Sequence, residues 1–362
     1  MSYRFTRYEP KYREEIVRLQ TVLWGPDLAL NTAYLAWKYE QNPYLDEPLI
    51  YLALHNERVV GMRGLFGAQW EIGRSGQTVI LPCAGDTTIA AEHRNRGLLR
   101  QLLQFIQDDK ALSAFPFMLS LSAGAPVYFC SLSEGWRLIG AYGAVARTSL
   151  IGKLLRSERL RSMARPWQHH PAVKKVLNAA AHLRRPSAPR GHIQSSSHPR
   201  AEDMARLVER TDRADKIRQR KDSRFYAWRF GSPLSRYRFY YQQANGLEGF
   251  LVLNTRLAVG PVHLVDWATS TPEVLTDLLK AAVQDFGSLE IWSATLPETM
   301  VATLGELGFT PAESILPDTA YRPSLLAQRL NAAWLDDKWS LAGRDVSDLK
   351  TWELRMVCSD QY

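Results

Sequence analysis

The chain has 362 residues, enough for two domains with a sizeable core, and its 46% hydrophobic and 23% charged residues are typical of a soluble globular protein. No apolar run reaches the roughly 20 residues of a membrane helix, and the charged first residues lack the apolar core of a secretion signal. Cys83, Cys130 and Cys358 are widely spaced and match neither a disulfide framework nor a zinc site. We therefore expect a cytoplasmic protein without a metal.

The net charge of +8 is concentrated in one segment. Residues 153–190 contain ten basic residues and a single acid, Glu158, so the remainder of the chain is close to neutral. General affinity for nucleic acid is therefore not expected. The basic segment is interpreted either as a solvated connector or as a weak contact for an anionic surface.

The first elements follow from hydrophobic spacing. Apolar residues at helical intervals predict a helix over 8–24, and a short helix with Asn31 or Thr32 as its cap ends before Pro43. Four strands are expected next, at 49–54, 59–66, 69–72 and 78–84.

The stretch from Val79 to Gln104 organises the first half of the chain. A short apolar strand is followed by Arg94-Asn95-Arg96-Gly97, and Leu98 and Leu99 begin a helix with apolar residues at helical spacing. The first amides of a helix have no partner within it, and glycine lets the backbone approach an anion closely. The pattern predicts a loop that binds a diphosphate.

This loop resembles the R/Q-x-x-G-x-G/A acyl-CoA loop of the GCN5-related N-acetyltransferases, with Leu99 in place of the last small residue. A strand over 116–123 and a helix over 128–136 that closes with Gly135-Trp136 also match this family in order. The resemblance covers about residues 3–150. It implies acetyl-CoA or another acyl-CoA as co-substrate, with the acyl carbonyl near Thr88 and Ile89 and the diphosphate at the residues Arg94, Asn95, Arg96, Gly97, Leu98 and Leu99.

The second half echoes the first. Ala227-Trp228-Arg229-Phe230 is similar to Ala36-Trp37-Lys38-Tyr39, and Asp266 lies in a strand where the first half has Asp86. Thr271-Pro272-Glu273 forms a good helix start but supplies no cationic phosphate loop.

Together with the resemblance, the repeat predicts an α/β fold of two tandem domains, each a mixed, mostly antiparallel sheet flanked by helices. The expected divisions are an acyl-CoA domain over 1–150, a basic segment and linker over 151–195, a degenerate domain without a CoA loop over 196–330, and a tail over 331–362. We expect the tail to dock through its tryptophans.

Acyl transfer to an amine requires a base for the amine and an acid for the leaving thiolate. Asp86, inside the central strand, is the candidate base, and strand alternation would put it on the same face as Thr88. The alternative for Asp86 is a structural pair with a nearby arginine or a cap of a backbone turn. Tyr128 is the candidate acid, and core packing is its alternative role.

The sequence therefore favours an acyl-CoA-dependent N-acyltransferase that acts on a small primary amine. The acceptor is not identified, although aromatic residues of the first half would suit an amino sugar. Two other functions stay open, an aminoacyl-tRNA-dependent peptidyl transferase with tandem domains and a non-catalytic acyl-CoA-binding protein.

Overall fold

The computed structural model describes residues 2–147, 193–211, 215–255, 262–312, 322–330 and 339–362. The basic segment 153–190 lies outside these ranges, so its contact with an anionic surface stays a prediction. Within the ranges, none of the helices combines the length and the apolar character that crossing a bilayer requires.

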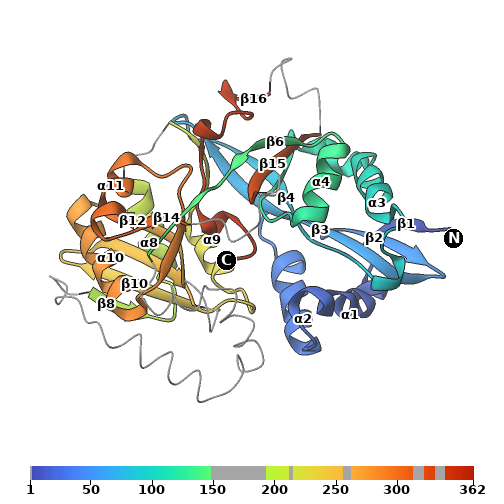
Figure 1. Cartoon of the computed structure of the whole chain (residues 1–362), viewed down its shortest axis with the longest axis horizontal. Helices are drawn as coiled ribbons and strands as arrows, with labels where there is room; N and C mark the ends of the chain where they lie inside the picture. Colours follow the sequence, from blue (N-terminus) through green and yellow to red (C-terminus); the bar gives the residue numbers. More distant parts are fainter. Residues whose placement is uncertain (1, 148–192, 212–214, 256–261, 313–321, 331–338) are drawn as a thin grey trace.

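The first sheet carries the predicted loop. In spatial order it contains β1 (Arg4–Arg7), β2 (Leu49–His55), β3 (Arg58–Ile72), β4 (Gln77–Ile89), β5 (Phe117–Ser120), β15 (Ser324–Arg329) and β6 (Arg137–Ala141). Neighbours are antiparallel except β4 and β5, which are parallel. Helices α1 (Arg13–Trp24) and α2 (Leu28–Leu35) lie on one face, and α3 (Leu98–Gln107) and α4 (Ala125–Ser133) cover the other (Figure 1).

The second sheet repeats this pattern. In spatial order it contains β14 (Thr310–Pro311), β7 (Ala144–Arg147), β13 (Leu289–Trp292), β12 (Val262–Thr269), β11 (Leu247–Asn254), β10 (Tyr237–Gln243) and β8 (Ile193–Ser196). Among the described strands of this sheet, the parallel pair is the central one, between β12 and β13, as β4 and β5 are in the first sheet. Helices α8 (Ala201–Arg210) and α9 (Ser223–Arg229) pack on one face, and α10 (Pro272–Phe286) and α11 (Glu298–Glu306) on the other. The predicted fold class is confirmed.

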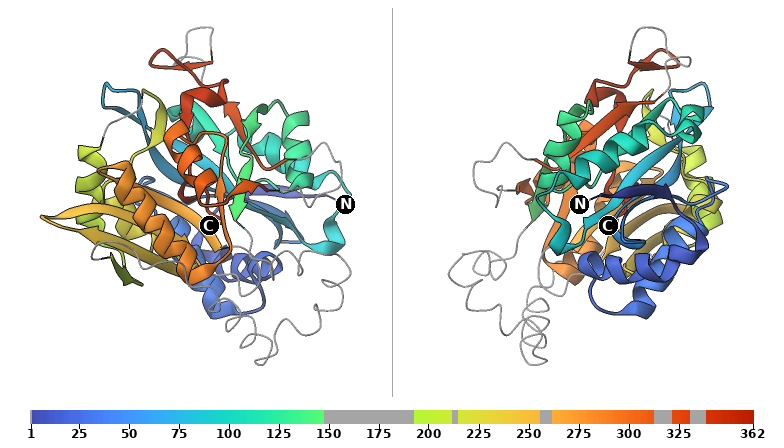
Figure 2. Two further views of the ribbon diagram at one scale, coloured as in Figure 1. Left: turned by 60° about the vertical axis from the view of Figure 1, so that its left-hand side comes forward. Right: turned by 90° about the vertical axis from the view of Figure 1, so that its right-hand side faces the viewer.

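Each sheet is completed by a strand from the other half. Strand β15 enters the first sheet between β5 and β6, and β7 enters the second sheet between β13 and β14. The short strand β9 (Ile217–Gln219) extends the first sheet beside β3, and β18 (Trp352–Glu353) pairs in parallel with β9. The expected domain boundaries stay predictions, while sheet membership crosses them. Figure 2 shows the resulting side-by-side packing of the halves.

The two tryptophans that mark the repeat meet between the sheets. The rings of Trp37 and Trp228 stack with centroids 5.2 Å apart and planes inclined by 14°. Trp37 Nε1 donates to the carbonyl oxygen of Trp228 at 2.7 Å, and Trp228 Nε1 donates to the carbonyl oxygen of Trp37 at 2.9 Å. A single hydrophobic cluster continues from α1 to α8 and α9, so the halves share a core.

Two local predictions are wrong. Helix α2 begins at Leu28 because the Asp27 side chain accepts a hydrogen bond from the Leu30 amide, so the cap is neither Asn31 nor Thr32. Residues 69–72 do not form a separate strand, because β3 runs unbroken to Ile72. The residues after α2, Ala36–Glu40, form a π-helical turn.

Replacing one member of the tryptophan pair tests the shared core. Trp37→Ala should lower the free energy of unfolding by about 3–5 kcal/mol, the usual cost of truncating a buried aromatic residue. Trp37→Phe should cost about 1–2 kcal/mol, because it keeps a ring but loses the indole donor. Urea unfolding measures both. If Trp37→Ala and Trp228→Ala prove fully additive in the double variant, the two halves are not coupled through this stack.

Candidate active site

A cavity of about 690 Å³ opens where the parallel pair of the first sheet separates. Strands β4 and β5 pair at Cys83 with Leu119 and at Ala84 with Ser120, and β5 then ends while β4 continues to Ile89. Eight predicted site residues line the cavity: Asp86, Thr88, Ile89, Arg94, Asn95, Gly97, Leu98 and Leu99. Two others, Arg96 and Tyr128, are not part of the lining.

The predicted phosphate loop leads into α3. Gly97 is the N-cap residue and adopts a left-handed conformation with φ of 71°. A side chain on Gly97 would meet little crowding, so the backbone conformation favours glycine here. Having no side chain, Gly97 cannot cap the first amides of α3, and the first turn carries no acid. These amides and the positive end of the helix dipole suit an anion at the cavity mouth.

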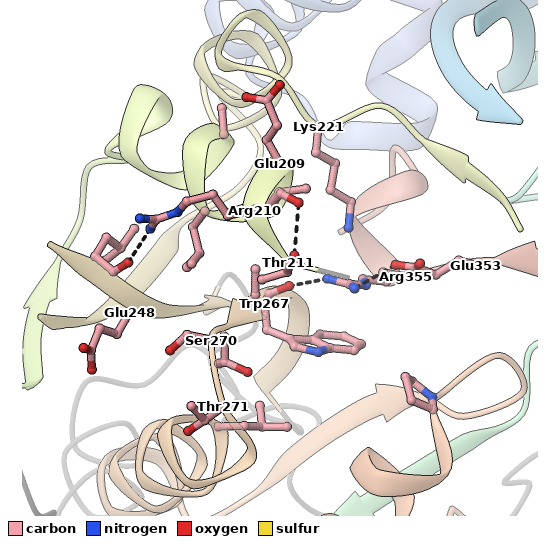
Figure 3. A pocket seen from close by; sticks show the side chains of 18 of the residues that line it. Glu209, Arg210, Thr211, Lys221, Glu248, Trp267, Ser270, Thr271, Glu353 and Arg355 are labelled. Carbon is pink, nitrogen blue, oxygen red and sulfur yellow. Dashed lines mark hydrogen bonds and ion pairs between the residues drawn. The ribbon is translucent and has the colours of Figure 1, made fainter. Parts of the chain in front are cut away.

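The second half has a cavity in the corresponding place, of about 880 Å³. It lies at the end of β12 and at the start of α10, where Ser270 and Thr271 face it (Figure 3). Unlike α3, helix α10 has a side-chain cap, because Thr271 Oγ1 accepts a hydrogen bond from the Val274 amide. The acid Glu273 lies in its first turn. This arrangement disfavours an anion, in agreement with the absence of an Arg-x-x-Gly sequence.

Lys221 and Arg355, two basic residues that line the second cavity, are engaged by acids. Lys221 Nζ lies 2.7 Å from Asp266 Oδ1, and the Arg355 guanidinium pairs with Asp266 at 2.9 Å. Arg355 also pairs with Glu353 at 2.7 Å (Figure 3). Its larger volume therefore does not make it the better phosphate site, and the first cavity is the candidate active site.

Asp86 lies at a β-bulge. Met62 pairs with Thr88 and Gly64 with Gly85, so Asp86 and Thr87 together lie opposite Arg63. Asp86 has a positive φ of 45°, and simple strand alternation does not hold at this point, contrary to the prediction that relied on it. The bulge turns the Asp86 carboxylate toward α2 and the π-helical turn.

Asp86 belongs to a buried charge cluster. Its carboxylate accepts from Lys38 Nζ at 2.9 Å and from the hydroxyls of Tyr39 at 2.7 Å and Tyr34 at 3.4 Å. Lys38 Nζ also donates to Asp360 Oδ2 at 2.6 Å. The structural alternative for Asp86 was a pair with a nearby arginine, whereas the partner in the structure is a lysine, Lys38. The predicted role of Asp86 as a base stays a prediction.

The cluster shifts the pKa values of its members in different directions. Burial raises the pKa of Asp86, and Lys38 only partly offsets this effect. Burial alone would raise the pKa of Asp360, but Lys38 and the hydrogen bonds of this carboxylate hold it below its usual value. Burial opposes the charge on Lys38, yet Asp360 and Asp86 together raise its pKa. Asp86 is therefore the carboxyl group of this cluster that takes a proton more readily.

The segment 356–362 closes the cavity from the side of the second half. Arg229, fully buried, donates to the carbonyl oxygens of Val357 at 2.9 Å and Ser359 at 2.7 Å. These contacts place the Asp360 carboxylate next to Lys38 and above Gly85. A Cβ atom at position 85 would lie 2.5 Å from this carboxylate, so the close approach requires glycine. The sequence analysis missed Lys38 and Asp360. Lys38, between two aromatic residues of the repeated motif, carried a signal, whereas Asp360 carried none.

Tyr128 lies in the hydrophobic cluster between the sheet and α3, with residues such as Leu102 and Ile106. Only 4% of its surface is exposed. This position favours the packing alternative over the acid role, and the acid role stays a prediction.

The comparisons with known proteins agree with this architecture. No protein-family model and no curated protein sequence matches the chain. A probable N-acyltransferase from Enterococcus faecalis V583 is 12% identical with a TM-score of 0.57, and a GCN5-related N-acetyltransferase from Anabaena variabilis is 11% identical with a TM-score of 0.58. Both alignments cover 91% of this chain and 73% of the other.

A tandem GNAT (GCN5-related N-acetyltransferase) protein from the clavulanic acid biosynthesis pathway is 13% identical with a TM-score of 0.55. The alignment covers 91% of this chain and 99% of that protein. The chain therefore has the fold of the GCN5-related N-acetyltransferases. The neighbours include a protein of the tandem form.

Removing the buried ammonium group should destabilise the fold. Lys38→Met leaves two carboxylates buried without their cation, and loss of one partner of a buried ion pair costs about 3–5 kcal/mol. Urea unfolding at neutral pH measures this change. Adding Asp86→Asn should recover part of the loss. Lys11→Met, which removes an exposed lysine paired with Glu9, is the control and should change little. A Lys38→Met variant as stable as this control would contradict the role of the cluster.

Proposed function

We propose that the protein is an acyl-CoA-dependent N-acyltransferase that uses acetyl-CoA or another acyl-CoA and transfers the acyl group to a small primary amine. The observation that carries the proposal is the cavity between the separated strands β4 and β5, with the glycine-started helix α3 at its mouth. The diphosphate of CoA would lie on the first amides of α3. The pantetheine arm would then follow β4 from Ile89 toward Gly85.

The residues around the bulge fit the chemistry of acyl transfer. The amine nitrogen attacks the thioester carbonyl carbon, the carbon–sulfur bond breaks, and CoA leaves as a thiol after receiving a proton. Asp86 takes the proton of the amine, directly or through a water molecule. The raised pKa of Asp86, caused by burial, supports this role because an unperturbed aspartate is too weak a base at neutral pH.

The acceptor would approach from the α1 face. Trp24 and Asp360 line the same cavity there, so that side offers an aromatic ring and a carboxylate. Carboxylates attract an ammonium group, and an aromatic ring suits the apolar face of a sugar. These residues support a small amine, such as an amino sugar, as acceptor.

The two alternative functions have less support. A transferase that uses aminoacyl-tRNA does not need a loop for the diphosphate of CoA, and the geometry at Gly97 favours such a ligand. A non-catalytic acyl-CoA-binding protein would keep the loop but would not need Asp86 at the bulge. The absence of turnover with every amine of a broad library, despite acyl-CoA binding, would favour this second alternative.

A matched pair of substitutions at Gly97 tests the donor site. Asparagine and aspartate both tolerate a left-handed conformation, and they differ here only in charge. Gly97→Asn should retain measurable binding of acetyl-CoA, whereas Gly97→Asp should abolish it because a carboxylate would lie against the diphosphate. Calorimetry measures affinity and stoichiometry, with one site per chain expected. Two sites, or equal affinity in both variants, would count against the proposal.

The pH–rate profile of Asp86→Asn tests the base. Turnover should fall by about 10²–10⁴-fold, affinity for acyl-CoA should persist, and turnover should partly recover at high pH where the free amine is abundant. Release of free CoA thiol with an amine library gives the readout. Asp360→Asn removes the other carboxylate partner of Lys38 and should act mainly on the KM for the amine, so the two variants are compared at saturating amine. Similar losses in both variants would assign Asp86 a structural role.

A further inference from the structure

Arg63 is a buried cation with unused hydrogen-bond donors. Only 1% of its surface is exposed, and it lines the candidate active site from strand β3. Its Nη1 donates to Thr87 Oγ1 at 2.9 Å, whereas its Nε and Nη2 have no hydrogen-bond partner among the described residues. Its guanidinium carbon lies 5.3 Å from the ring centroid of Trp136. Two donors of a fixed guanidinium fork are therefore buried without a partner in a residue that lines the cavity.

No acid of the cavity neutralises this arginine. The carboxylates of Asp86 and Asp360 are both engaged by Lys38. Burial raises the pKa of the nearby Cys130 thiol, so this group is neutral at physiological pH. Burial lowers the pKa of Arg63, but only to about 10, so the side chain stays protonated. An unpaired buried charge is costly, and a ligand that supplies the counter-charge would offset this cost.

The position of Arg63 in the register identifies the part of the ligand that it would meet. Arg63 lies opposite the bulge at Asp86 and Thr87, several residues along β4 from the phosphate loop at Arg94. A CoA thioester bound with its diphosphate at α3 would have its acyl group at the level of this bulge. Arg63 is thus too far along the strand for the diphosphate and lies where the acyl group would end.

From this geometry we propose that the acyl group carries a terminal carboxylate, so that the donor is the CoA thioester of a short dicarboxylic acid, bound through the guanidinium of Arg63. The inference rests on the proposed acyl-CoA function of the same cavity. The carboxylate accepts from Nε and Nη2 in a bidentate contact, which planar guanidinium groups form well. It does not react: the amine still attacks the thioester carbonyl, and CoA leaves as the thiol.

Two stable CoA thioethers of matched length test this proposal by calorimetry, one with a carboxypropyl and one with a butyl group. The wild-type protein should bind the carboxypropyl compound about ten- to hundredfold more tightly, the range expected for a charge-assisted contact. Arg63→Met should bring the two affinities together while butyl-CoA affinity persists. Arg100→Met, which removes a mostly exposed arginine that lines the same cavity, should retain the preference.

Equal affinity for the two thioethers in the wild-type protein would overturn the proposal, and an unchanged preference in Arg63→Met would do so as well. Binding of butyl-CoA in either case would leave the proposed donor site standing, whereas failure to bind any CoA compound would overturn both. If Arg63→Met does not fold, Arg63→Lys replaces it. Lysine keeps the charge without the planar fork, so the preference should shrink several-fold.

Discussion

The ammonium group of Lys38 is the interaction on which the candidate site depends. It holds Asp86 of the first sheet and Asp360 of the segment 356–362, so it joins parts of the chain that are far apart in sequence. Two carboxylates around one cation leave an excess negative charge, and burial makes Asp86 the group that takes up a proton more readily. In the proposed reaction, this cluster would attract the ammonium group of the acceptor and take up its proton.

The two halves use the same strand pattern but close their central helices in different ways. Gly97 leaves the first amides of α3 without a side-chain cap, whereas Thr271 caps α10 and Glu273 adds a negative charge to its first turn. In the second cavity, Lys221 and Arg355 are also bound to Asp266, so their charges are not available to a ligand. The first amides of α3 are therefore available to an anion, whereas a side chain of the protein already caps the first turn of α10.

Local sequence patterns predicted the fold better than the site. The spacing of the loop and of the apolar residues predicted β4 and α3, and the echo of Trp37 in Trp228 predicted two similar sheets. The exchange of β7 and β15 could not be predicted, because their pairing depends on contacts between residues more than a hundred positions apart. The bulge at Asp86 was not predicted because it depends on the register between β4 and β3, which the alternation of a single strand does not specify. Arg63 and Asp360 became visible only when folding placed them at one cavity.

Asp86 and Arg63, both of which line the candidate site, lie on opposite sides of the first sheet. The bulge turns Asp86 toward Lys38 and Tyr39 on the α2 side, while Arg63 packs against Trp136 in the cluster beneath α3 and α4. Because the sheet separates them, the carboxylates do not cancel the charge of the arginine. A cationic acceptor and an anionic acyl group would each be drawn to its own side and held with the reacting atoms at the bulge. The bulge that interrupts the alternation of β4 therefore lets the Asp86 carboxylate face the α2 side at the same level of the sheet at which Arg63 faces the α3 side.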